Sequence, residues 1–272
     1  MANVQPLRSY ATLRNTSAMT AAPRTLRDMV LEEHLNDPSK KQQYVTAMFD
    51  IIAPKYDRFT RWFSFGMDAV WKKELLEDVK DKVKPDATCI DLASGTGDLS
   101  FAVAQIVPQG HVTGIDFSAE MVNIAKTRAE AALAPNVSFQ EGDMMALDLA
   151  DRSVDLVTIG YGLRNVPDLR AALCQIARVL KPGGILANLD FNRPRNVVWR
   201  FLFLTYLTII GNLYGWCMHG EGPVYGYIAR SIAKFVTLQE LSDEMKAADL
   251  EVLVTNPKLF GGVCMQIARK RA

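Results

Sequence analysis

The chain has 272 residues, of which 49% are hydrophobic and 22% are charged, enough to bury the core of one large domain. Its formal net charge of +1 provides no basic face for nucleic acid, so we expect no nucleic-acid partner. The four cysteines are widely separated and the three histidines are scattered, so the sequence has no zinc-binding pattern and predicts no metal. We expect the cysteines to be buried free thiols in a reducing compartment.

The first 27 residues contain four arginines and several serines and threonines, but no acidic residue. This composition is typical of an organelle transit peptide. The alternative interpretation is a disordered extension, or a start codon assigned too early. In either case we expect residues 28–272 to form the folded domain.

Residues 44–71, YVTAMFDIIAPKYDRFTRWFSFGMDAVW, combine an apolar helix face with a dense group of aromatic side chains. We interpret this segment as an N-terminal cap on the domain or as a lid over an apolar ligand. The two interpretations are compatible.

Short apolar strands alternate with amphipathic helices over most of the chain. The predicted strands cover residues 88–92, 111–115, 137–140, 155–160, 185–189, 251–255 and 263–268, and the predicted helices cover residues 72–84, 99–107, 119–133, 169–180 and 237–248. The sequence Lys-Pro-Gly-Gly at 181–184 marks the end of a helix before a new strand. This alternation predicts an α/β fold whose mostly parallel sheet carries helices on both faces.

The most apolar segment is 197–218, in which residues 201–218 carry no charge and reach the lower length limit for a membrane span. Threonine, glycine and asparagine residues dilute the run, and it lies between strands of one domain. We therefore favour a buried helix, or an apolar lid that faces a lipophilic substrate or a bilayer, over a true span. The predicted substrate lid covers residues 197–232.

Residues 87–100, ATCIDLASGTGDLS, have the pattern of a strand, a glycine turn and a helix that begins at Asp98. Glycine allows the backbone to approach a ligand and to adopt a positive φ, so Gly95 and Gly97 indicate a nucleotide-binding loop. An ordinary strand-to-helix turn is the alternative. The loop lacks both the Lys-Ser/Thr of a P-loop and the third glycine of a dinucleotide fingerprint.

Two acidic residues follow strands at the edge where open α/β sheets bind ligands, beyond the carboxyl ends of the strands. Asp116 closes the second strand, where a carboxylate can accept both hydroxyls of a ribose, and Asp143 follows the third, near an adenine amino group. Asp155 begins a strand instead, so we assign it a structural role. A glycine loop with these acids fits a nucleoside that carries no phosphates, and S-adenosylmethionine meets that description.

The motifs IDLASGTGDLS, GIDFSAEMV, EGD, TIGYGLRNV and RVLKPGG resemble those of class I S-adenosylmethionine-dependent methyltransferases. With FDIIAPKYD, SFGMDAVWK and YGYIARSI, they resemble more closely the UbiE/MenG family of ubiquinone and menaquinone biosynthesis C-methyltransferases, over about residues 49–269. GYGLRNV and LDFNRP are similar to its cyanobacterial and plastid branch, which methylates demethylphylloquinol. The resemblance implies a Rossmann-like fold with a seven-stranded, mostly parallel sheet.

The resemblance also implies roles for individual residues. Cofactor binding is expected of Asp91, Gly95, Thr96, Gly97, Asp116, Asp143, Met144 and Gly160. The arginine of the family's GLRN motif lies beside the methyl-transfer centre, so the expected catalytic residues are Arg164, Asn165 and Tyr56. Tyr161, Tyr225 and Tyr227 are expected to bind the substrate.

In the implied reaction, a ring carbon of a prenylated quinol attacks the methyl group of S-adenosylmethionine. An arginine stays protonated at neutral pH, so we expect Arg164 to stabilise the phenolate or to orient a water that removes the proton. The alternative role for Arg164 is a salt bridge that holds the loop after the fourth strand.

The chain departs from the family pattern at Thr60, Asp68 and residues 144–149, and residues 206–222 match it poorly. Two other functions therefore stay open, a methyltransferase for another small apolar phenol or amine and a cofactor-binding scaffold without turnover. The expected partners are a lipophilic quinol, a membrane surface contacted peripherally, and a second copy of the chain or a quinone-biosynthesis assembly. The expected location is a plastid rather than a mitochondrion, or the cytoplasm of a bacterium.

Overall fold

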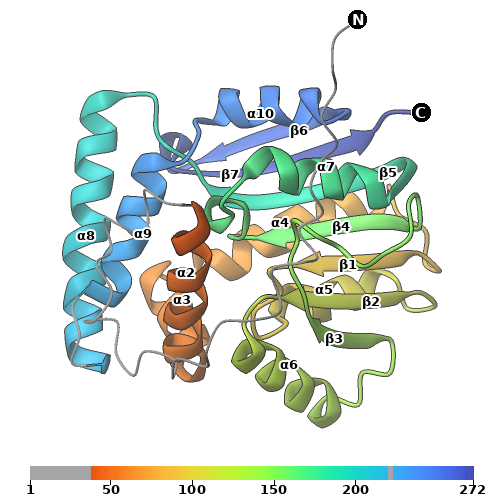
Figure 1. Ribbon diagram of the computed structural model, residues 1–272, viewed down its shortest axis with the longest axis horizontal. Helices are drawn as coiled ribbons and strands as arrows, with labels where there is room; N and C mark the ends of the chain where they lie inside the picture. The colour runs from red at the N-terminus through yellow and green to blue at the C-terminus, as the bar shows by residue number, and fades with distance from the viewer. Residues whose placement is uncertain (1–37, 220–222) are drawn as a thin grey trace, which may run out of the picture.

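A computed structural model describes residues 38–219 and 223–272, so the predicted transit peptide, residues 1–27, lies outside the described residues. Seven strands form one sheet in the order β3-β2-β1-β4-β5-β7-β6 (Figure 1). They are β1 (Thr88–Leu92), β2 (His111–Asp116), β3 (Val137–Glu141), β4 (Val154–Gly160), β5 (Leu180–Phe191), β6 (Leu250–Lys258) and β7 (Val263–Lys270). β7 runs antiparallel to β5 and β6, and the other pairs are parallel. All seven predicted strands and the mostly parallel α/β sheet are confirmed.

Helices cover both faces of this sheet (Figure 1). In chain order they are α2 (Pro38–Ile52), α3 (Tyr56–Phe63), α4 (Met67–Lys80), α5 (Asp98–Ile106), α6 (Ala119–Ala131), α7 (Leu169–Val179), α8 (Val197–His219), α9 (Pro223–Lys234) and α10 (Leu238–Ala247). Cys89 and Leu156 pack toward α4, α5 and α6, whereas their neighbours Ile90 and Val157 pack toward α7 and α10. Because successive side chains of a strand point to opposite faces, these continuous apolar strands require cover on both sides.

Two element boundaries differ from the sequence prediction. α4 begins at Met67, earlier than predicted, because Gly66 adopts a φ of 76° and redirects the chain after α3. β5 begins at Leu180, directly after α7, so the Lys-Pro-Gly-Gly sequence lies inside the strand and not in a connection before it. Gly183 supplies a positive φ there, which explains the glycine.

Four helices lie beyond the carboxyl ends of the parallel strands, where α8 and α9 stand beside α2 and α3 (Figure 1). They share an apolar cluster with contributions from α2 (Tyr44, Met48, Ile52), α3 (Phe59, Phe63), α8 (Phe203, Leu207, Tyr214) and α9 (Tyr227, Ile228, Ile232). Helices α2 and α3 therefore pack against α8 and α9 over the edge of the sheet where a ligand is expected.

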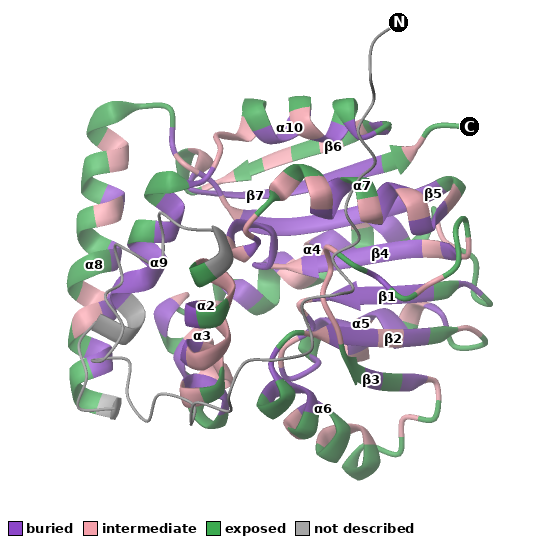
Figure 2. Ribbon diagram, viewed as in Figure 1, coloured by how far each residue is buried: buried purple, intermediate pink, exposed green. Residues whose placement is uncertain are grey.

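Helix α8 is long and apolar enough over Val197–Cys217 to cross a membrane, with a mean hydropathy of 1.4. Phe203 and Leu207 face inward, whereas Phe201 and Trp216 are 69% and 74% exposed, so one side of the helix is uncovered (Figure 2). The alternative of a buried helix is therefore wrong. The apolar composition serves an inner face that packs on α9 and an outer face that nothing in the described chain covers.

The thiols also differ from expectation. Cys89 and Cys264 are buried and free, as predicted, but Cys174 and Cys217 are free and exposed. Cys174 lies in the amphipathic helix α7, and Cys217 lies near the end of α8. Composition and spacing alone do not separate the two pairs.

Candidate active site

The glycine loop joins β1 to α5 at the carboxyl edge of the sheet. Gly95 and Gly97 have φ values of 55° and 92°, in the left-handed region that favours glycine. A Cβ atom on Gly97 would lie 2.6 Å from Cζ of Phe139, so a side chain does not fit there. At Gly95 the nearest atom to such a Cβ would be Cε1 of Tyr56 at 4.0 Å, which leaves space beside the loop. The loop has the backbone that a cofactor-binding turn requires.

Replacing Gly97 with alanine is expected to lower the free energy of unfolding by about 3 kcal/mol, since left-handed strain costs about 1–2 kcal/mol and overpacking about 1–3 kcal/mol. Urea denaturation measures the loss. Gly183→Ala is the matched control, because Gly183 also has a positive φ but has open space around its Cβ position. Equal losses for the two variants would contradict the packing argument.

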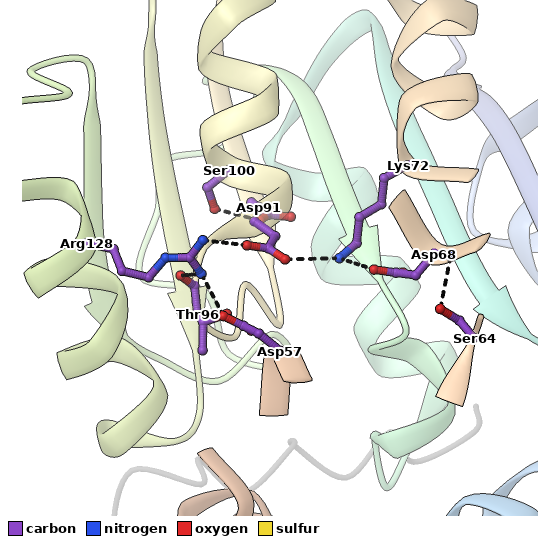
Figure 3. Close-up of polar contacts among 9 residues, drawn as sticks. Asp57, Ser64, Asp68, Lys72, Asp91, Thr96, Ser100 and Arg128 are labelled. Atoms are coloured by element: carbon purple, nitrogen blue, oxygen red, sulfur yellow. Dashed lines mark hydrogen bonds and ion pairs between the residues drawn. The ribbon is translucent and has the colours of Figure 1, made fainter. Parts of the chain in front are cut away.

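The N-terminal segment is tied to the glycine loop by a polar network (Figure 3). The Thr96 hydroxyl donates to Asp57 Oδ1 at 2.6 Å. Arg128 of α6 donates to Asp57 Oδ2 at 3.2 Å, to the Thr96 carbonyl at 2.8 Å and to Asp98 at 2.6 Å. Asp57, which follows Tyr56 in the YD motif, therefore holds α3 against the loop. Sequence reasoning missed Arg128, because a lone arginine in an amphipathic helix carries no signal.

Asp116 lies at the end of β2, beside the glycine loop. Its Oδ2 accepts the Gly95 amide at 2.7 Å, and its Oδ1 accepts the Ser118 amide at 2.9 Å. Burial raises the pKa of this carboxyl, and the backbone amides partly offset that rise. Each carboxylate oxygen can still accept a second hydrogen bond, so the group remains able to bind a pair of hydroxyls.

Asp143 follows β3 and lines one cavity together with Gly95 of the glycine loop. Its Oδ1 accepts the Met145 amide at 2.8 Å, and its Oδ2 accepts Nε2 of Gln42 at 3.2 Å. Met144 and Gly160 line this cavity together with Asp116 and Asp143. The structure thus brings together the residues predicted to bind the adenosine part of the cofactor, and adds Gln42 from α2.

A smaller, polar cavity continues past the loop, and Asp91, Asp98, Thr96 and Lys72 are among its lining residues. Asp91 is buried and accepts the hydroxyls of Ser100 and Thr158 at 2.6 and 2.8 Å. Burial raises the pKa of Asp91 to about 6, against the lowering effect of these hydrogen bonds. Asp91 and Lys72 give this cavity both a carboxyl group and an ammonium group.

An apolar cavity of about 370 Å³ lies under the four helices at the sheet edge. Aromatic side chains dominate its walls: Phe49, Tyr56, Phe59, Phe63, Phe65, Trp71, Tyr161, Phe191, Trp199, Phe203, Tyr206 and Tyr227. Tyr56 and Tyr161 also line the cavity at Asp116 and Asp143 and the polar cavity at Asp91, which together we call the cofactor-side cavities. The three cavities therefore meet at these two tyrosines.

Arg164 lies at this junction and lines the apolar cavity. Its Nη1 atom donates to Asp190 Oδ1 at 3.0 Å and to the Tyr161 carbonyl at 2.6 Å. Its buried Nε atom has no hydrogen-bond acceptor among the described residues. The guanidinium carbon lies 5.2 Å from the centre of the Phe191 ring, in cation–π contact. Arg164 therefore forms the salt bridge of the alternative interpretation, with Asp190, and also lines the apolar cavity.

Asn165 and Tyr227 brace the turn η4 (Leu163–Asn165) that carries Arg164. Asn165 donates to the Tyr161 carbonyl at 3.2 Å and accepts the Tyr227 hydroxyl at 3.1 Å. Lys41 of α2 donates to the carbonyls of Arg164 and Val166 at 3.0 and 2.7 Å, and burial lowers its pKa to about 8. Lys41 was not identified from the sequence.

Two further predictions concern Tyr225 and Asp155. The side chain of Tyr225 lies outside the described part of the structure. Asp155 accepts the Thr88 amide at 2.9 Å and pairs with Lys181 at 2.7 Å, away from the cavities. The structural role predicted for Asp155 is confirmed.

No cluster of three or more His, Cys, Asp or Glu side chains suited to a metal ion occurs within residues 38–219 and 223–272.

Comparison with known proteins identifies the family. Residues 38–270 match the ubiE/COQ5 methyltransferase family. The demethylmenaquinone methyltransferase of Bacillus cereus is 34% identical over 231 residues, which cover 85% of this chain and 97% of that protein.

Solved structures share the fold. The [4+2]-cyclase SpnF superposes with a TM-score of 0.64 at 18% identity, over 85% of this chain and 96% of that one. A SAM-dependent methyltransferase from Aquifex aeolicus has a TM-score of 0.54 at 18% identity, over 73% and 89% of the two chains. The family match over residues 38–270 and the 34% identity over most of both chains show that the protein belongs to the ubiE/COQ5 family of S-adenosylmethionine-dependent methyltransferases.

Proposed function

We propose that this methyltransferase transfers a methyl group to a ring carbon of a prenylated naphthoquinol of the demethylmenaquinol or demethylphylloquinol type. The observation that carries the proposal is that Tyr56 and Tyr161 line both cofactor-side cavities and also the aromatic-lined cavity that Arg164 borders. A flat, apolar acceptor with a polar edge suits such a cavity, because aromatic walls bind its rings and a buried cation binds its oxygen. The demethylmenaquinone methyltransferase relative supports the quinol class.

The residues of the cofactor-side cavities fit S-adenosylmethionine, which supplies an electrophilic methyl group when bound. Asp116 can accept the ribose hydroxyls, and Asp143 can accept the adenine amino group. In the polar cavity, Asp91 can pair with the α-ammonium group and Lys72 with the α-carboxylate. A carboxyl group and an ammonium group in one cavity match the zwitterionic end of an amino acid.

The pKa of Asp91 predicts how cofactor affinity depends on pH. Only the ionised carboxyl attracts an ammonium group, and the pKa of about 6 means that Asp91 becomes protonated as the pH falls below that value. We expect S-adenosylmethionine to bind about tenfold more weakly near pH 5 than near pH 7. Titration calorimetry at several pH values measures the effect. Asp91→Asn should bind weakly with a flat profile over this range; a wild-type profile without a decrease would contradict the role of Asp91.

Arg164 supplies the electrostatic part of the proposed mechanism. As the ring carbon attacks, electron density comes from the quinol oxygen, and a fixed cation beside that oxygen stabilises the phenolate character. The Asp190 carboxylate and the Tyr161 carbonyl fix the guanidinium in place before the substrate binds. Alignment at near contact in a cavity lined by apolar residues accounts for much of the remaining acceleration.

An acceptor panel tests this proposal. The purified protein is incubated anaerobically with S-adenosylmethionine and, in parallel, with a demethylnaphthoquinol, a polyprenyl benzoquinol, and a simple phenol and amine of similar size. We expect the highest kcat/KM for the naphthoquinol. A higher value for the phenol or the amine would replace the proposed substrate class.

We also propose that the protein contacts a bilayer peripherally through α8 and the rim of the apolar cavity. Phe65, Tyr206 and Leu259 line the cavity and are also exposed, with Phe65 80% exposed, so the rim is continuous with the apolar outer face of α8. A lipophilic acceptor could then pass from lipid to cavity without crossing water. Co-flotation with neutral phosphatidylcholine vesicles should be strong for the wild type and weak for Phe201→Ser/Trp216→Ser. Equal flotation would contradict this surface.

A further inference from the structure

Asp68, in the first turn of α4, is a buried acid at the wall of the apolar cavity. Asp68 is 7% exposed, and most of the other side chains that line this cavity are apolar. Oδ2 pairs with Nζ of Lys72 at 2.8 Å, and the backbone amide donates to the Ser64 hydroxyl at 3.3 Å (Figure 3). Oδ1 is buried and accepts no hydrogen bond from any residue in the described ranges. Oδ2 is thus paired with Lys72, whereas Oδ1 has no donor within hydrogen-bond geometry among the described residues.

An acceptor atom left without a donor in an apolar environment is costly, so a folded chain rarely keeps one without use. A solvent-exposed aspartate could equally pair with Lys72 and stabilise the N-terminus of α4. Neither explains why the acid borders the acceptor cavity. A ligand that brings its own hydrogen-bond donor would supply the missing partner.

The groups around Asp68 suit that purpose. Burial raises the pKa of Tyr161 well above its usual value, and the charge of Asp68 and a hydrogen bond from the Tyr161 hydroxyl to its carboxylate raise it further. Tyr56 is also a neighbour, and burial raises its pKa. Both tyrosines therefore stay protonated near neutral pH. Among the charged groups that face this part of the cavity, Lys72 and Arg164 are cations, so Asp68 is the group able to take up a proton.

We propose that Asp68 is the general base that accepts the hydroxyl proton of the aromatic acceptor. The inference rests on the proposed function, because it concerns the same cavity and the same reaction. In this mechanism Asp68 removes the proton, and Arg164 stabilises the negative charge on the acceptor oxygen.

The step balances as follows. The ring carbon forms a bond to the methyl carbon while the methyl–sulfur bond breaks and its electron pair stays on sulfur. The hydroxyl proton moves to Asp68, and the hydroxyl carbon becomes a carbonyl carbon. The ring then loses its proton from the methylated carbon to water, and the carbonyl oxygen takes back the proton from Asp68. One proton is released overall, and the carboxylate is restored.

A carboxylate is a weak base for a free phenol, whose pKa is about 10. The hydroxyl becomes far more acidic as the ring carbon bonds to the methyl group. An aspartate is therefore a strong enough base to accept the proton in concert with methyl transfer. The expected contribution is about 10²–10⁴-fold in turnover, as for other general bases.

The kinetic test uses Asp68→Asn, with Asp78→Asn on the same helix as the matched control. Near pH 7 we expect Asp68→Asn to lower kcat by about 10²-fold or more, and Asp78→Asn to leave it unchanged. Between about pH 7 and pH 9 the activity of Asp68→Asn should rise about tenfold per pH unit, because an acceptor that ionises in solution needs no base. A parallel loss at every pH would overturn the role.

A binding test is independent of turnover. With S-adenosylhomocysteine present, the wild type should bind 1-naphthol about tenfold or more tightly than 1-methoxynaphthalene, because Asp68 accepts a hydrogen bond from the hydroxyl alone. In Asp68→Leu, this preference should disappear while the far-ultraviolet circular dichroism spectrum, which reports folding, is unchanged. A preference that survives the substitution would overturn the inference. A wild type that shows the preference but methylates no quinol would refute the proposed function and leave the proton acceptor in place.

Discussion

Replacement of Arg164 with alanine is expected to lower kcat by about 10²–10³-fold while leaving S-adenosylmethionine affinity nearly unchanged. The guanidinium borders the acceptor cavity rather than the cofactor-side cavities, so its charge acts on the acceptor oxygen. Turnover assays and titration calorimetry separate the two effects. Loss of both in equal proportion would contradict the assignment.

This variant also loses the partner of a buried carboxylate, Asp190. Leaving such a charge unpaired costs about 3–5 kcal/mol of stability, so Arg164→Ala must be checked by thermal unfolding. Arg164→Lys keeps a cation for Asp190 but loses the Nε atom that has no partner in the described structure. It should be nearly as stable as the wild type and still slow. Arg170→Lys, at an exposed pair with Glu244, is the matched control and should change neither property.

Replacement of Asp116 with alanine should weaken S-adenosylmethionine binding by about 10²–10³-fold, the largest loss of affinity we expect from a single substitution. Two charge-assisted hydrogen bonds to the ribose contribute about 1.5–3 kcal/mol each. The substitution also releases the Gly95 and Ser118 amides, which loosens the glycine loop. Titration calorimetry is again the direct measurement.

Asp155→Asn is the control for this second variant. Asp155 lies at the start of β4, two strands away from β2 and at the amino ends of the parallel strands, so the same loss of charge there should leave cofactor affinity unchanged. Unchanged affinity in Asp116→Ala would remove Asp116 from the cofactor site. A large effect of Asp155→Asn would show that the loss at Asp116 reflects general damage to the sheet.

The sheet and the cofactor-side residues could be predicted because their signals are local. Each strand is a short apolar run next to a turn, and Gly97 sits where both φ and Phe139 demand glycine. Asp116 and Asp143 were found because parallel strands end at one edge, so position along the strand determines position in space. These arguments need only periodicity and order along the chain.

The residues that hold the site residues in position could not be predicted, because their contacts depend on packing between distant segments. Asp190 differs from other aspartates only by its pairing with Arg164, and Arg128 matters only because α6 brings it to Asp57. Asp68 appeared in the sequence only as a departure from a family pattern. Its place at the cavity wall follows from how α3 and α4 pack over the sheet.

Helix α8 shows a second limit of sequence reasoning. Its composition gave a nearly uniform apolar segment, and composition does not determine which side of a helix other elements will cover. The structure covers the side that carries Phe203 and Leu207 and leaves the other side open. The packing of α9 against α8 is what determines which side is covered.

The most direct test of the central claim is to follow the methyl group itself. S-adenosylmethionine with a deuterated methyl group is incubated with the purified protein and a demethylnaphthoquinol, and the product is examined by mass spectrometry and NMR. The account predicts the label on the ring carbon next to a hydroxyl-bearing carbon, with a large decrease in Arg164→Lys. Label on a quinol oxygen, or no labelled quinol while S-adenosylmethionine binds normally, would contradict it.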